Sequence, residues 1–257
     1  MNVTHLNKYR KKKRQPNRNF KIPTPVIYFL LTAVGLYFFI HSPFFAIKDI
    51  KVVGNRLLET EKIVNLSQVK TGQNLMELDK KDIGEKVAVH PFVKEVEIKR
   101  RLPNTLEIKI IERDPVGLVV CSDGFIQVSE EGHFLALVND IGEYSLPVIS
   151  GISLDQLPGP GQIINNPGLQ MALQIVKNCQ RSLLKNIAEI NIANKKHILA
   201  YTLTGIEIRL GSFAGVTERL TGLNEILQDF NEKNILEKNI EYIDLRFTGP
   251  PIIKTKK

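Results

Sequence analysis

The stretch HPFVKEVEIKRRLPNTLEIKIIERDPVG, residues 90–117, predicts two β-strands joined by a tight turn. Apolar residues recur at every second position within each predicted strand: Val96, Ile98, Leu106, Ile108 and Ile110. Because alternate side chains of a strand point to opposite faces, these residues predict one buried face. The charged residues between them predict that the other face is exposed to solvent. Pro103 and Asn104 favour a turn between the two strands.

The residues before this hairpin predict a third strand and two short helices. Ile50 and Val52 alternate with charged residues, and Gly54 with Asn55 then marks a turn. Two segments have the apolar spacing of short helices: 59–67, which carries Ile63 and Leu66, and a second one, which carries Ile83 and Val87. Asp79 can cap the second helix. We therefore expect the order strand, helix, helix, strand, strand, with both helices on one face of a three-stranded sheet.

Three blocks of this region together resemble a known domain. They are IKDIKVVGN (47–55), KTGQNLMELD (70–79) and the stretch at 90–117. In that order they resemble the POTRA domain of the bacterial cell division family FtsQ/DivIB, which implies a POTRA domain (βααββ) over residues 46–114. The family often has Trp where this chain has Phe92, and a small residue such as Ala where it has Gly117; neither difference alters the expected architecture.

Residues 115–253 predict a mixed β-sheet domain of the FtsQ/DivIB type with two or more helices. Short apolar runs separated by turn residues predict the strands, and helices are expected near 167–178 and 216–231. The second helix has apolar residues at intervals of four and three: Val216, Leu220, Leu223, Leu227 and Phe230. This stripe predicts packing on the sheet. The final run, YIDLRF at 242–247, resembles the closing strand of the family.

The first 47 residues predict a membrane anchor. Residues 1–21 hold eight basic residues and no acidic one, and the 26 residues from Ile22 to Ile47 hold no Asp, Glu, Lys or Arg. A transmembrane helix at 22–45 is long enough to cross a bilayer, and the basic flank predicts a cytoplasmic tail at 1–21 with all later residues outside. A cleaved signal peptide ending near Ala46 is the alternative, but the long charged leader favours an uncleaved anchor.

The expected fold class is therefore α+β, with a single transmembrane helix, a POTRA domain, a mixed β-sheet domain and a short basic end at 254–257. The basic tail is interpreted mainly as a determinant of topology, with contact to anionic lipid head groups as a by-product. It lacks the interleaved aromatic residues or folded basic face that would favour nucleic-acid binding.

The chain lacks the sequence signatures of common catalytic and metal sites. Its five histidines are scattered, and Cys121 and Cys179 lie 58 residues apart. It has no G-x-S-x-G elbow, no H-E-x-x-H motif and no P-loop. We therefore expect no enzyme activity, no metal, no cofactor and no small-molecule substrate. The two cysteines are interpreted as separate core residues, although an oxidising exterior would allow them to pair.

The resemblance implies a binding role for the last strand. In FtsQ the closing strand and the helix before it receive a segment of the partner FtsB (DivIC), which comes with FtsL. By position, the partner-binding residues are Tyr242, Ile243, Leu245, Arg246, Phe247 and Thr248. Chain ends often lie at sheet edges, so we expect 240–247 to be an edge strand that 248–253 continues, with Pro250 and Pro251 shortening the edge. An ordinary core strand is the alternative, because the run has apolar groups on both faces. Asp244 and Arg246 share a face, which predicts a local salt bridge.

The POTRA domain supplies a second candidate docking surface on its middle strand, with Val93, Glu95, Glu97 and Lys99. The implied function is a bitopic, non-catalytic scaffold of the division septum that binds FtsB/DivIC-like and FtsL-like proteins, with its C-terminal domain outside the cell membrane, and helps to coordinate septal wall synthesis. Two alternatives stay open. An export or chaperone component predicts several tandem POTRA units or a barrel-like segment, and a membrane-anchored cell-wall hydrolase predicts a polar catalytic pocket.

Overall fold

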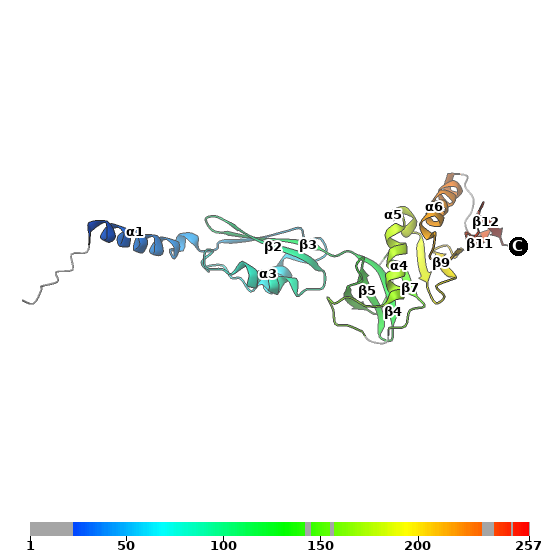
Figure 1. Cartoon of the computed structure of the whole chain (residues 1–257), viewed down its shortest axis with the longest axis horizontal. Helices are drawn as coiled ribbons and strands as arrows, with labels where there is room; N and C mark the ends of the chain where they lie inside the picture. The colour runs from blue at the N-terminus through cyan, green and yellow to red at the C-terminus, as the bar shows by residue number, and fades with distance from the viewer. Residues whose placement is uncertain (1–22, 142–144, 155–156, 233–238, 248, 257) are drawn as a thin grey trace, which may run out of the picture.

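The computed structural model describes residues 23–141, 145–154, 157–232, 239–247 and 249–256 (Figure 1). One apolar helix is followed along the chain by a small sheet domain and then by a larger one, here called the first and second domains. The predicted basic tail at 1–21 lies outside the described residues, as do Thr248 and Lys257.

The apolar helix α1 (Thr24–Ile40) is followed by the short 3-10 helix η1 (Pro43–Phe45). None of the α1 residues is buried, and the 22 residues from Thr24 to Phe45 are long and apolar enough to cross a membrane. Pro25 lies in the first turn of α1, where the missing backbone N–H costs no intrahelical bond. The predicted span thus corresponds to the exposed apolar helix α1 and the short η1 that follows it.

The first domain has the predicted order βααββ. Its elements are β1 (Asp49–Val53), α2 (Thr60–Ser67), α3 (Lys80–Ala88), β2 (Val93–Arg101) and β3 (Thr105–Glu112). The sheet order is β1-β3-β2, with β1 parallel and β2 antiparallel to β3. Asp79 caps α3 by accepting hydrogen bonds from the backbone N–H groups of Lys81 and Asp82. The core includes the predicted residues of both helices and of β3: Ile63, Ile83, Val87, Leu106, Ile108 and Ile110.

The sheet order corrects one detail of the prediction. The strand that carries Val93, Glu95, Glu97 and Lys99 is not the middle strand, because β3 occupies the centre and β2 lies at an edge. β3 is central because it pairs on one side with its hairpin partner β2 and on the other with β1. Val93 is also only 1% exposed and packs in the core, so its assignment to a docking surface is wrong.

The second domain is built on a nine-stranded sheet of order β12-β11-β10-β9-β8-β7-β4-β5-β6. The strands are β4 (Pro115–Cys121), β5 (Gly124–Ser129), β6 (Phe134–Val138), β7 (Val148–Ser150), β8 (Ile187–Asn191), β9 (Ile198–Thr202), β10 (Glu207–Gly211), β11 (Ile240–Asp244) and β12 (Ile252–Thr255). Parallel and antiparallel pairs both occur, so the predicted mixed sheet is confirmed.

The described part of the second domain has three helices: α4 (Pro167–Asn178), α5 (Arg181–Leu184) and α6 (Val216–Glu232). The apolar stripe of α6 is buried as predicted, because Val216, Leu220, Leu223, Leu227 and Phe230 all belong to the core. Asn166 caps α4 by accepting hydrogen bonds from the N–H groups of Gly168 and Leu169. The expected α+β class, with an apolar helix and two sheet domains, is therefore confirmed.

The two domains meet through a short polar junction. Only Arg113 and Asp114 separate β3 from β4. Lys94 Nζ of the first domain lies 2.5 Å from Glu131 Oε1 of the second. The guanidinium of Arg113 donates to Pro91 O at 3.0 Å and lies 3.5 Å from His133 Nε2. The junction is thus held by side-chain contacts in addition to the chain itself.

The end of the chain differs from the prediction. The strand predicted at 240–247 ends at Asp244, and it is not the edge of the sheet. Instead of continuing the strand, the chain reverses and returns as β12, which pairs antiparallel with β11 and lies outside it. Pro250 and Pro251, which lack backbone donors and resist the ladder geometry, lie at this reversal. The prolines were expected only to shorten the edge formed by β11. They lie instead where the chain reverses, and β12 then covers that edge.

Candidate partner-binding surface

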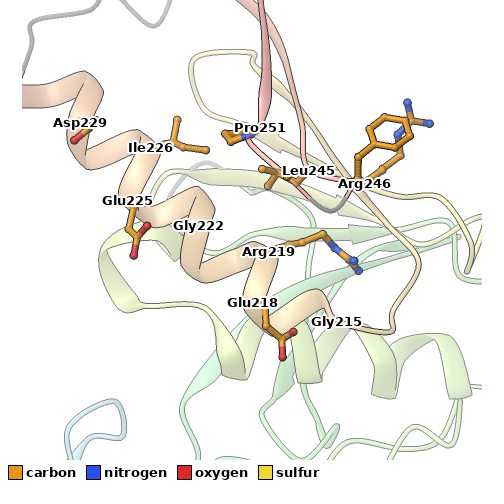
Figure 2. Close-up of a pocket in the computed structure, with 12 residues that line it drawn as sticks. Gly215, Glu218, Arg219, Gly222, Glu225, Ile226, Asp229, Leu245, Arg246 and Pro251 are labelled. Atoms are coloured by element: carbon orange, nitrogen blue, oxygen red, sulfur yellow. The ribbon is translucent and has the colours of Figure 1, made fainter.

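A groove of about 810 Å³ lies between α6 and the chain that leaves β11 (Figure 2). Gly222 and Ile226 line it from the helix, and Leu245, Phe247 and Pro251 line it from the other side. Figure 2 shows Ile226 directed toward the side of the groove on which Leu245 and Pro251 lie. The groove therefore has an apolar lining that is contributed by two segments far apart in the sequence.

The rim of the groove on α6 is acidic. Glu218, Glu225 and Asp229 line it at intervals of seven and four residues, which place them on one side of a helix. Gly222 lies between them, and no atom lies within 4 Å of the position that a Cβ would occupy there. The backbone of α6 is thus open to close approach at Gly222, next to carboxylates that favour a partner with basic groups.

Arg219 fixes the start of α6 beside the groove. Its Nη2 donates to Ala214 O at 2.7 Å and to Ser212 O, in the loop that leads into the helix. Burial is the main reason that the pKa of Arg219 lies below its usual value. Arg219 therefore serves to hold this loop against the helix.

An ion pair between the buried carboxylate of Asp244 and the partly exposed side chain of Arg246 fixes the other wall. The carboxylate of Asp244, whose side chain is 4% exposed, accepts from Arg246 Nε at 2.9 Å and from Arg246 Nη2 at 2.6 Å. Hydrogen bonds from the Arg246 side chain are the main reason that the pKa of Asp244 is lowered. The predicted local salt bridge is confirmed, and it holds the chain just before Phe247 in a defined position.

Tyr242 lies between cationic groups on the outer part of the sheet. The guanidinium of Arg209 lies 3.8 Å from the ring centroid, and Lys254 Nζ of β12 lies 5.5 Å from it. Arg209 Nε is also 2.7 Å from Glu207 Oε1 on the same strand, β10. Cation–π contacts of this kind hold the ring in place and leave it half-buried.

The six predicted partner-binding residues do not share one environment. Ile243 is 0% exposed and belongs to the core, so it is not available to a partner in this conformation. Leu245 is mostly buried but lines the groove, and Phe247 is 63% exposed within it. Arg246 lines the groove, Tyr242 is half-buried and is not among the lining residues, and Thr248 lies outside the described residues.

Sequence reasoning missed two parts of this surface. One is β12, whose Ile252 and Ile253 are 51% and 42% exposed at the outer edge of the sheet. The other is the open face of α6. Residues 218, 222, 225 and 229 recur at helical spacing opposite the apolar stripe, and this pattern was the signal that could have indicated the face.

On the first domain, Glu95 and Glu97 are exposed on the edge strand β2. Lys99 Nζ lies 2.8 Å from Glu97 Oε2, and its hydrogen bond is the main reason that the pKa of Glu97 is lowered. The structure brings these three residues together on one exposed strand. It places them in a different domain from the groove.

The described residues include no group of three or more His, Cys, Asp or Glu side chains that could hold a metal ion. Cys121 and Cys179 are free thiols. Burial raises the pKa of Cys179 to about 12, so this thiol stays protonated at neutral pH and is a poor nucleophile.

Two family models match the chain. Residues 45–113 match the model of the FtsQ-type POTRA domain, and residues 119–246 match the model of the C-terminal domain of the cell division protein FtsQ/DivIB. Together they cover the first domain and most of the second, including α6, β11 and the ion pair of Asp244 with Arg246, but not β12.

Full-length relatives agree with these matches. The cell division protein DivIB of Clostridium botulinum (strain Loch Maree / Type A3) is 26% identical over 97% of this chain and 96% of its own length. The cell division protein FtsQ of Geotalea daltonii is 26% identical over 83% of this chain and 77% of its own. The solved extracytoplasmic domain of DivIB from Geobacillus stearothermophilus aligns with a TM-score of 0.33 and 14% identity, over 47% of this chain and 96% of that one.

Proposed function

Because the chain belongs to the FtsQ/DivIB family of cell division proteins, we propose that it is a non-catalytic scaffold of the division septum that acts by binding other proteins. Its second domain captures a segment of an FtsB/DivIC-like partner, which comes with an FtsL-like protein. By holding these partners at the membrane, it helps to coordinate septal wall synthesis.

The observation that carries this proposal is the apolar groove beside an open sheet edge. The groove is lined by Leu245, Phe247 and Ile226, and its rim carries the carboxylates of α6. β12 lies at the outer edge of the sheet, and all four of its residues are exposed. An edge strand offers unpaired backbone groups to an added strand, and each such bond contributes about 0.5 to 1.5 kcal/mol net. A helix or loop of the partner, next to its added strand, would fill the groove.

The proposed topology follows from the anchor. The basic residues before α1 favour a cytoplasmic N-terminus, which places both folded domains outside the membrane. Protease added outside wall-stripped cells is expected to digest the two domains. Protection of both domains from that protease would contradict this orientation.

Partner capture can be tested at the two accessible aromatic residues. We expect Tyr242→Ala combined with Phe247→Ala to weaken binding of the partner by about 2 kcal/mol, roughly 30-fold, because exposed or half-buried aromatic anchors dominate interfaces. The measurement is a titration of the purified protein with its FtsB/DivIC-like partner. Circular dichroism should show that the variant stays folded.

A matched control keeps this test specific. Leu203 is 69% exposed on the turn between β9 and β10, and it is not among the residues that line the groove. Leu203→Ala should leave the affinity unchanged. Equal affinities for the double variant and the unmodified protein would rule out this surface as the docking site.

Location in the cell tests the wider proposal. A fluorescent fusion of the full chain is expected to form rings at midcell in dividing cells. A uniform membrane signal throughout the cell cycle would contradict a septal role. Turnover of peptidoglycan by the purified protein, abolished by a single substitution, would contradict the non-catalytic assignment.

A further inference from the structure

The first domain is fastened directly to the end of the membrane helix. α1 ends at Ile40, and Asn74 Nδ2 of the first domain donates to Ile40 O at 2.8 Å. The backbone N–H of Leu75 donates to Phe45 O at 2.8 Å, and His41 Nε2 lies 3.4 Å from Glu77 Oε1. The loop at 70–77 therefore lies against the point where the helix ends.

The turn between β2 and β3 lies at the same end of the domain. The backbone N–H groups of Lys48 and Asp49 both donate to Asn104 O, at 2.9 and 3.5 Å. This turn therefore lies beside the residues that directly follow the anchor. In Figure 1 the domain extends from this end toward the second domain. Leu102, in the turn, is 63% exposed.

The side chains at this end combine apolar and cationic groups with two carboxylates, Asp49 and Glu77, which lie within 4 Å of Lys51 and His41 respectively. Phe44 is 56% exposed, and its ring stacks on that of Phe39 in α1 with 5.9 Å between centroids. Lys48 and Lys70 are exposed, and neither ammonium group forms an ion pair with any residue that the structure describes. Aromatic and aliphatic groups beside unpaired cations match the boundary between acyl chains and phosphates in a bilayer.

The length of α1 brings these groups to that boundary. A helix of 17 residues is roughly 25 Å long, whereas the hydrocarbon core is about 30 Å thick. The apolar residues that follow α1 must therefore lie close to the membrane surface for the span to be complete. Phe44 is among them, and the loops of the first domain are bonded to the same segment.

We propose that Phe44, Lys48, Lys70 and Leu102 form a membrane-contacting base, which lies on the lipid leaflet from which α1 emerges. Phe44 and Leu102 contact the acyl chains, and the two lysines contact phosphate groups of anionic lipids. This base fixes the first domain at the membrane surface and sets the height at which the second domain is presented. The proposal goes beyond partner binding and does not depend on it, since it requires only the membrane helix.

The test uses the full chain in nanodiscs of phosphatidylglycerol with brominated acyl chains. The native cysteines are removed by Cys121→Ser and Cys179→Ala, and a fluorophore is attached at Leu102→Cys. We expect brominated lipid to lower its emission by at least about twofold, because bromine quenches only fluorophores within the acyl region. The matched control carries the label at Leu203→Cys and should not be quenched. Equal emission of the Leu102→Cys label in brominated and plain lipid would overturn the proposal.

A charge reversal tests the lysine contacts separately. Lys48→Glu with Lys70→Glu should weaken the quenching at position 102 in phosphatidylglycerol and leave it unchanged in neutral phosphatidylcholine. Lys195→Glu with Lys196→Glu changes the same charge in an exposed turn of the second domain and should have no effect. Undiminished quenching in phosphatidylglycerol after reversal of Lys48 and Lys70 would overturn the contact with anionic lipid.

Discussion

β3 and β11 are both inner strands, but their side chains are buried in different ways. In β3, buried positions alternate with more exposed ones, and Leu106, Ile108 and Ile110 all face the helices. At the end of β11, Ile243, Asp244 and Leu245 are buried in succession. One face of β11 packs in the apolar core, and the other is covered by the ion pair of Asp244 with Arg246. A strand face that carries polar residues is therefore not always exposed to solvent.

The largest expected effect concerns the apolar face of β3. Leu106→Ala should lower the free energy of unfolding of the first domain by about 3 kcal/mol, because Leu106 is fully buried and its loss leaves a cavity. Urea denaturation followed by hydrogen exchange of the β1 and β3 amides measures this loss. Leu102→Ala, on the exposed turn, should change it by less than about 0.5 kcal/mol. Similar losses for both variants would contradict the one-sided core.

A smaller effect is expected from the polar face of β11. Asp244→Asn should lower the stability of the second domain by about 2 kcal/mol, because the Arg246 guanidinium loses a charged acceptor in a mostly buried position. Glu241→Gln is the control, since Glu241 pairs with Lys254 at 3.1 Å on the exposed surface. It should cost less than about 0.5 kcal/mol. Equal losses of stability for Glu241→Gln and Asp244→Asn would contradict a contribution from burial of the Asp244 carboxylate.

The same carboxylate predicts a pH dependence. The pKa of Asp244 is lowered in the folded protein, chiefly by hydrogen bonds from Arg246. Its contribution is therefore fully present above the ordinary pKa of 3.8 and is lost as the pH falls through the lowered value. The Asp244→Asn variant should lack this part of the acid sensitivity. Denaturation midpoints of the unmodified protein and of Asp244→Asn, measured between neutral pH and pH 2, should converge as the pH falls.

The smallest effect is expected at the junction between the domains. The hydrogen bond from Lys94 is the main reason that the pKa of Glu131 is lowered to about 2, from an ordinary value of 4.5. Its stabilising effect is present above pH 4.5 and is lost as the pH falls toward 2. Because both side chains are partly exposed, Glu131→Gln should cost under about 1 kcal/mol at pH 7, and less in high salt. A cost that does not change with salt would contradict an electrostatic contact.

The contrast between β3 and β11 also explains which features could be predicted from the sequence. The alternation of Leu106, Ile108 and Ile110 and the stripe of α6 each follow from burial on one face, so the pattern alone was sufficient. Asp79 was predicted as a cap for the same local reason. Local patterns carry no information about which strand lies at an edge, because strand order depends on distant pairing.

The errors in the candidate site have the same origin. Ile243 was expected at a docking edge, but β12 pairs with β11 and occupies that edge. The side chain of Ile243 packs in the apolar core. The reversal occurs at two prolines, which indicate a break in a strand without specifying where the chain goes next. The groove could not be predicted because α6 and Leu245 come together only through the packing of the whole sheet.

The parallel pairing of β1 and β3 has a mechanical consequence. The membrane helix joins the chain just before β1, and the second domain joins it just after β3. Tension between the anchor and a captured partner would pull these strands in opposite directions along their length, so that the five paired positions from Asp49 to Val53 bear the load together. We expect such shear to require a higher rupture force in single-molecule pulling than unzipping β2 from β3, starting at the end opposite their shared turn. The first domain would then act as a stiff coupling between the membrane helix and the second domain.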